Sequence, residues 1–142
     1  MEIIHDGLNA SRFDKIRAIA EWPAALTHLR VCYQKNETAP NCGRCRKCLW
    51  TMMLLRAAGH LDRTTTFAVP LDMAALRLYP PKTTNEIDRF REAIALLETR
   101  DADPDFRSVL QEMLGSKGRQ PFKGQFERIV ARARNYLAHR LP

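Results

Sequence analysis

The sequence lacks three features that would each indicate a protein class directly. No apolar run approaches the roughly 20 residues that span a bilayer, and residues 1–6 have neither the basic nor the apolar region of a signal peptide. There is no phosphate-binding loop of the form G-x-x-x-x-G-K-[ST], no internal repeat and no low-complexity tract. We therefore expect neither a membrane protein nor a secreted one, and we predict a cytoplasmic, reducing location.

Acidic residues are scarce at the carboxyl end of the chain. The 142 residues carry 23 Lys and Arg against 16 Asp and Glu, and residues 117–142 hold +6 of the formal net charge of +7. A nearly neutral body with a basic end predicts one basic face, or a solubilising tail, rather than an evenly basic surface. In this tail Phe122 and Phe126 lie among basic residues, as in proteins that stack bases while contacting phosphates. The candidate anion or nucleic-acid contacts are Lys123, Arg128 and Arg132.

Apolar residues recur at helical spacing along most of the chain, which predicts a mainly α fold. Ser11 and Asp14 resemble a capping box at a helix start, and Asp103-Pro104 is a typical helix entry. Residues 29–33 indicate either a short strand or an extended segment, and residues 64–71 an extended linker. The pattern predicts helices over about 12–21, 46–58, 72–78 and 104–114, one entered at 84 or 85, and a last one near 126–137.

All four cysteines fall within 17 residues, as Cys32-x9-Cys42-x2-Cys45-x2-Cys48. A tetrahedral ion such as zinc takes four thiolates at about 2.3 Å, and the short C-x2-C spacing presents two sulfur atoms to one point. Gly43 allows a positive φ, so that amide N–H groups can turn toward the sulfur atoms. The amino-terminal end of the helix predicted from residue 46 also favours thiolate over thiol. These residues predict a closed metal site.

Three chemistries compete for this cysteine set. Structural zinc is the preferred interpretation, because a closed four-cysteine set in a reducing compartment most commonly holds that ion. An iron–sulfur cluster also uses C-x2-C-x2-C, but the proline that follows the last cysteine of bacterial ferredoxins is absent here. Disulfides are disfavoured in a reducing compartment. Arg44, Arg46 and Lys47 lie in or beside the cluster, where we expect them to offset the charge of the thiolates.

Several motifs follow one another in a familiar order: His5-Asp6-Gly7, then Ser11-Arg12-Phe13-Asp14-Lys15, then Leu29-Arg30-Val31-Cys32-Tyr33, then the run from Asn41 to Cys48. This order resembles the carboxy-terminal segment of PP-loop ATP pyrophosphatases, in particular the 7-cyano-7-deazaguanine synthase family. The resemblance covers about residues 3–58. It implies zinc bound by Cys32, Cys42, Cys45 and Cys48, and it makes His5, Asp6, Ser11 and Arg12 candidate substrate-binding residues.

The chain departs from that family in one important respect. The catalytic Ser-Gly-Gly-x-Asp-Ser loop is absent from the 142 residues, so we expect no catalysis by this chain alone, although the family consists of ATP-dependent ligases. We expect residues 1–63 to form the PP-loop-enzyme-like segment with its zinc knuckle, and residues 64–142 a small helical bundle ending in a basic helix. The expected partner is an amino-terminal PP-loop domain or subunit. The alternative is a small zinc-containing protein that binds nucleic acid or another protein.

Overall fold

A computed structural model describes residues 10–34, 37 and 39–115, and this part of the chain is mainly helical. No strand occurs in these ranges, where one isolated parallel bridge joins Asn41 to Phe67. The mainly α prediction is therefore confirmed, and residues 29–33 take the extended alternative. The described helices are α1 (Arg12–Ala20), α2 (Pro23–Thr27), α3 (Arg46–Ala58), η1 (Leu61–Arg63), α4 (Met73–Arg77), α5 (Thr84–Thr99) and α6 (Pro104–Leu114).

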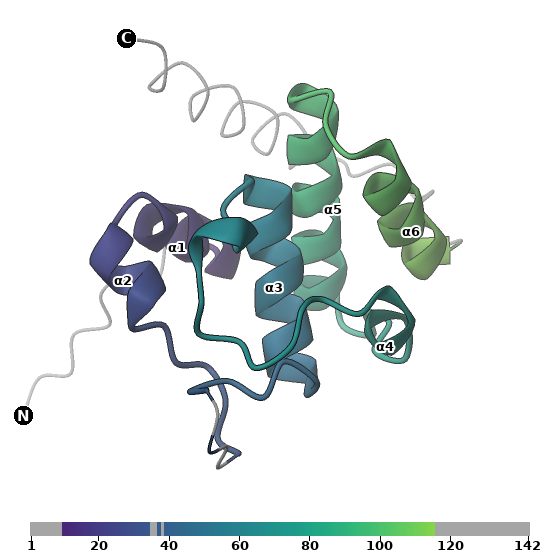
Figure 1. The fold of residues 1–142 in the computed structure, drawn as a ribbon. Helices are drawn as coiled ribbons and strands as arrows, with labels where there is room; N and C mark the ends of the chain where they lie inside the picture. Colours follow the sequence, from purple (N-terminus) through teal and green to yellow (C-terminus); the bar gives the residue numbers. More distant parts are fainter. Residues whose placement is uncertain (1–9, 35–36, 38, 116–142) are drawn as a thin grey trace, which may run out of the picture.

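Helix α3 lies at the centre of the fold (Figure 1). Helices α1 and α2 lie on one side of it, α5 lies on the other, and α6 packs on the outside of α5. Because α3 is surrounded, it is apolar almost all the way round, and Met53 and Leu55 are completely buried. Trp50 on α3 packs edge-to-face against Phe90 on α5, with ring centroids 5.4 Å apart. This packing holds the amino-terminal end of α3 against α5.

The helix boundaries follow from local capping groups. The Ser11 side chain accepts a hydrogen bond from the Asp14 backbone N–H, and the Asp14 carboxylate accepts one from the Ser11 N–H, which begins α1. Gly59 ends α3 with a φ of 76°, and the Asp103 side chain caps α6. Helix α2 is the exception, since the sequence pattern predicts a helix over about 12–21 and none directly after it. Pro23 instead occupies the first turn of a new helix, where its missing N–H costs nothing.

Buried side chains from both sides of residue 63 share one hydrophobic cluster. Phe13 and Leu55 come from before that position, while Phe90 and Leu97 come from after it. The division at residue 63 therefore stays a prediction drawn from the resemblance. No helix in the described part of the chain is both long and apolar enough to cross a membrane. The last predicted helix, near 126–137, lies outside the described residues.

Candidate metal centre

The four cysteines meet where an extended segment, a loop and the start of α3 come together. Cys32 lies in the extended segment that follows α2, and Cys42 follows the bridge residue Asn41. Cys45 is the residue that precedes α3, and Cys48 lies in the first turn of that helix. The prediction of a helix that begins at residue 46 is confirmed. Their Sγ atoms, with those of Cys32 and Cys42, all lie within 4.8 Å of one another.

Four of the six distances between the sulfur atoms show that the cysteines lie close enough together to hold a metal. Cys32 Sγ lies 3.5 Å from Cys42 Sγ and 3.8 Å from Cys45 Sγ. Cys48 Sγ lies 3.8 Å from Cys42 Sγ and 3.5 Å from Cys45 Sγ. A regular tetrahedron with metal–sulfur bonds of about 2.3 Å has edges of about 3.8 Å. The four side chains are thus already arranged to hold a metal ion, and all four cysteines are free rather than joined in disulfides.

Backbone N–H groups point at these sulfur atoms. Gln34 N lies 3.4 Å from Cys32 Sγ, and Cys45 N lies 3.4 Å from Cys42 Sγ. The N–H of Gly43 donates to Cys48 Sγ, and Gly43 has the positive φ, 72°, that the sequence suggested. These donors partly offset the charge of the thiolates, as expected for cysteines that must be deprotonated to bind a metal.

Gly43 is required for a second reason. A Cβ at this position would lie 2.6 Å from Cγ2 of Val69 and 2.9 Å from the Val69 backbone oxygen. Both distances are far shorter than ordinary van der Waals contacts. The loop can therefore approach the segment after η1 only because residue 43 lacks a side chain.

Hydrogen bonding lowers the pKa of one of the four thiols, and burial raises the pKa of two others. The N–H of Cys42 is the main cause that lowers the pKa of Cys32 to about 6, against the opposing effect of burial. Burial raises the pKa of both Cys45 and Cys48 above the ordinary thiol value. A divalent cation at the common centre would favour the thiolate form of all four. Binding of a cation would therefore have to displace the proton that burial favours on Cys45 and Cys48.

Asn41 joins the cysteine segments and was not recognised in the sequence as a functional residue. Its Oδ1 accepts hydrogen bonds from Val31 N at 2.8 Å and Cys32 N at 3.1 Å. Its Nδ2 donates to Leu29 O at 2.7 Å and to Thr66 O at 3.2 Å. The residue is fully buried. It therefore fixes the backbone of Cys32, as groups that orient metal ligands do.

The basic residues beside the cysteines contact other groups. Arg46 forms an ion pair with Glu86 of α5, and its guanidinium carbon lies 4.5 Å from the centroid of the Trp50 ring. Lys47 Nζ lies 3.5 Å from the centroid of the exposed Tyr33 ring. Arg46 therefore neutralises Glu86, in addition to any effect on the thiolates that the sequence suggested.

The remaining candidate residues fall into two groups. Ser11 caps α1, and its hydroxyl donates to Glu92 Oε2 at 3.2 Å, so its polar atoms already have partners. Arg12 lines a cavity between α1, α3 and α5. Neither placement tests a role in substrate binding. The other candidates, which lie outside the described residues, are His5, Asp6, Lys123, Arg128 and Arg132.

Comparison of the chain with models of known protein families, with curated proteins and with solved structures finds no match. The case for a metal centre therefore rests on the geometry of the four cysteines alone. The likeness to PP-loop enzymes rests on the order and spacing of the motifs.

Proposed function

We propose that this chain is a structural zinc-binding module of a PP-loop ATP pyrophosphatase system, without catalytic activity of its own. The observation that carries the metal assignment is the set of Sγ separations of 3.5–3.8 Å. A single zinc ion fits these separations. An iron–sulfur cluster places several iron and sulfide atoms between its cysteines and needs wider spacing.

The ion would connect segments that have little other regular structure. Helix α2 ends at Thr27 and α3 begins at Arg46, and between them the described residues contain only the bridge at Asn41. Four cysteines complete a tetrahedral shell and leave no position for a reacting water, so the ion supplies folding free energy rather than chemistry. A structural role follows from the same geometry.

The PP-loop part of the proposal is supported by the motifs. The helix start at residues 11–15, the Cys32-Tyr33 pair and the run from Asn41 to Cys48 occur in the order found in that family. The chain has no Ser-Gly-Gly-x-Asp-Ser loop, so the ATP-binding part would be a separate domain or subunit. This module would complete that partner rather than act alone.

Metal analysis of the purified full chain tests the first part. We expect one zinc per chain, loss of that zinc in Cys48→Ser, and unfolding on strong chelation. Ser108→Ala, on the exposed surface of α6, is the control and should retain full zinc content. Iron with acid-labile sulfide would overturn the assignment of zinc. A chain that folds identically after chelation would overturn the structural role.

Co-expression tests the second part. The chain to test as a partner is one that carries the Ser-Gly-Gly-x-Asp-Ser loop but no cysteine cluster, sought first in the neighbouring open reading frames. We expect the two chains to co-purify and to hydrolyse ATP to AMP and pyrophosphate only together. Full ATP turnover by the partner without this chain, or no association between the two, would contradict the proposed role.

A further inference from the structure

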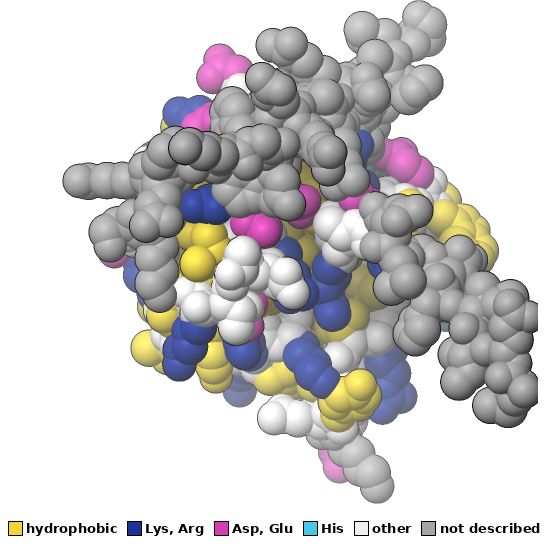
Figure 2. All heavy atoms as spheres, turned by 180° about the vertical axis from the view of Figure 1, so that it is seen from behind, with side chains coloured by type: hydrophobic (Ala, Val, Ile, Leu, Met, Phe, Trp, Pro, Cys, Tyr) yellow, Lys and Arg dark blue, Asp and Glu magenta, His cyan; other side chains and the backbone are white. Residues whose placement is uncertain are grey.

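A cavity of about 280 Å³ lies beside the metal centre, between α1, α3 and α5. Helix α1 contributes Arg12, and α5 contributes Glu86 and Arg89. The space-filling view from behind shows Lys and Arg side chains gathered on one face (Figure 2). The α3 residues that line the cavity are Arg46, Lys47, Trp50, Thr51 and Leu54.

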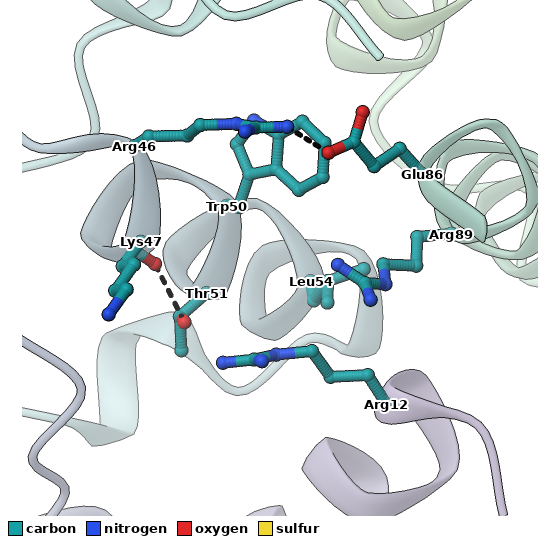
Figure 3. A pocket seen from close by; sticks show the side chains of 8 residues that line it. All are labelled: Arg12, Arg46, Lys47, Trp50, Thr51, Leu54, Glu86 and Arg89. Carbon is teal, nitrogen blue, oxygen red and sulfur yellow. Dashed lines mark hydrogen bonds and ion pairs between the residues drawn. The ribbon is translucent and has the colours of Figure 1, made fainter. Parts of the chain in front are cut away.

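Arg12 and Arg89 place two positive charges at this cavity. Arg12 extends from α1 and Arg89 from α5, and both reach across the same face of α3 (Figure 3). Neither guanidinium forms an ion pair with an acidic side chain in the part of the chain that the structure describes. Burial, followed by the nearby charge of Arg12, lowers the pKa of Arg89. The charges of Glu86 and Glu92 act on Arg89 in the opposite direction. Within the described ranges neither carboxylate forms an ion pair with Arg12 or Arg89, so the two guanidinium groups still favour an anion at that point.

The acidic residue among those lining the cavity, Glu86, is already engaged elsewhere. One of its carboxylate oxygens accepts hydrogen bonds from Lys82 N at 2.8 Å and Thr83 N at 3.0 Å, which caps α5. The other oxygen pairs with Arg46. Glu86 therefore orients Arg46 at the edge of the cavity and has no oxygen left over to pair with Arg12 or Arg89.

A second hollow of about 420 Å³ continues the first one toward the metal centre. The two share Arg12 and Lys47, and the second is also lined by Arg30, Cys32 and Tyr33. The positive charge thus extends from α5 to the segment that carries the first metal ligand. A ligand larger than a single anion could extend into this second hollow.

We infer that the cavity between α1, α3 and α5 binds the phosphate group of a small phosphorylated molecule, held between Arg12 and Arg89. A phosphate monoester carries a charge of about −1.5 to −2 near neutral pH, which matches two guanidinium groups. A carboxylate would neutralise only one of them. Arginine also presents paired N–H donors that fit phosphate oxygens.

The dimensions of the cavity favour a small molecule over a nucleic-acid strand. Its volume is close to the lower end of the roughly 300–1,000 Å³ that ligand pockets occupy. Proteins that bind single strands offer several exposed aromatic faces along a groove. Here Trp50 is 7% exposed and donates its Nε1–H to Tyr79 O, and the one exposed ring among the residues lining the two hollows, Tyr33, is contacted by Lys47 Nζ. Trp50 and Leu54 instead form an apolar wall beside the charged groups. Arg12 and Arg89 are not among the four cysteines, so the inference does not depend on the metal that the proposed zinc module holds.

Calorimetric titration of the metal-loaded full chain tests this inference, with inorganic phosphate and AMP as probes and acetate as the monoanion control. We expect phosphate and AMP to bind and acetate to bind at least about tenfold more weakly. Arg12→Gln and Arg89→Gln should each weaken AMP binding by about tenfold or more. Arg107→Gln on α6 removes the same charge outside the cavity and should leave binding unchanged.

Several results would overturn the inference. These are the absence of phosphate and AMP binding, equal losses in all three variants, or acetate binding as tightly as phosphate. Tight binding of a 20-nucleotide single strand that survives both cavity substitutions would assign nucleic-acid binding to another surface. Arg12→Lys and Arg89→Lys keep the positive charge but lose the paired N–H donors of the guanidinium. If these variants unfold as the wild type does but bind AMP more weakly, the two arginines recognise the ligand rather than stabilise the fold.

Discussion

Replacing Asn41 with alanine should destabilise the fold and the metal centre together. The substitution removes an amide that is fully buried and bonded on both sides. It leaves the N–H groups of Val31 and Cys32, and the carbonyl of Leu29, without the partner that Asn41 provides. A buried backbone group that loses its partner costs about 1–3 kcal/mol. Since Val31 and Leu29 are only partly buried, we place the total loss at about 3–5 kcal/mol.

The same substitution should weaken zinc binding. Cys32 is held by Asn41 from the backbone side, so its sulfur atom would no longer be fixed at the common centre. Loss of a group that orients a metal ligand typically lowers affinity by about 10–100-fold. Denaturant unfolding of the zinc-loaded chain measures the first effect, and competition with a chromogenic chelator measures the second.

Two further variants sharpen this experiment. Asn85→Ala removes the same side chain from the exposed first turn of α5 and should change the unfolding free energy by less than about 0.5 kcal/mol. Asn41→Asp keeps the acceptors for Val31 and Cys32 but directs a carboxylate oxygen at two backbone oxygens. It should therefore be destabilising as well. A loss below about 1 kcal/mol in Asn41→Ala, with unchanged zinc affinity, would refute the reasoning.

Three other predictions follow from the same structure. In denaturant unfolding, Gly43→Ala should destabilise the zinc-loaded chain more than Gly115→Ala does. Both glycines have a positive φ, but only at Gly43 would the added Cβ clash with other atoms, those of Val69. Equal losses of stability in the two variants would contradict this reasoning. Burial opposes ionisation of Glu86, but its backbone hydrogen bonds and its ion pair with Arg46 together outweigh that effect and lower its pKa to about 2. The stabilisation of the fold by ionised Glu86 is therefore complete above about pH 4.5 and is lost toward pH 2. The difference in unfolding free energy between wild type and Glu86→Gln should shrink over that interval, and a constant difference would contradict this prediction. Met53→Ala should cost about 2–5 kcal/mol in thermal unfolding, whereas exposed Leu78→Ala should cost almost nothing.

The helix boundaries could be predicted because capping is local. Ser11 with Asp14, Gly59, and Asp103 with Pro104 act within one turn of their own helices. Helix α2 was missed because proline occurs both after helix ends and in first turns. Burial of Leu26 accompanies this five-residue helix, and local sequence does not reveal that burial.

The sequence by itself determined the candidate metal ligands. Cys42, Cys45 and Cys48 lie within one loop and one helical turn, so their convergence follows from spacing alone, and Cys32 is the one cysteine that remains. The identity of the ion and the PP-loop partner stay predictions, because neither is set by the positions of the sulfur atoms alone.

Only the tertiary structure brought Asn41 to its hydrogen-bond partners and Arg89 to the cavity that Arg12 also lines. Asn41 joins Leu29 and Cys32 to Thr66, which lies 25 residues beyond Asn41 and reaches it only when the segment after η1 folds back to the loop. Arg12 and Arg89 come from α1 and α5, which lie far apart in sequence and are brought together against α3. Periodicity and spacing report contacts within a few residues, whereas these pairs depend on how whole helices pack.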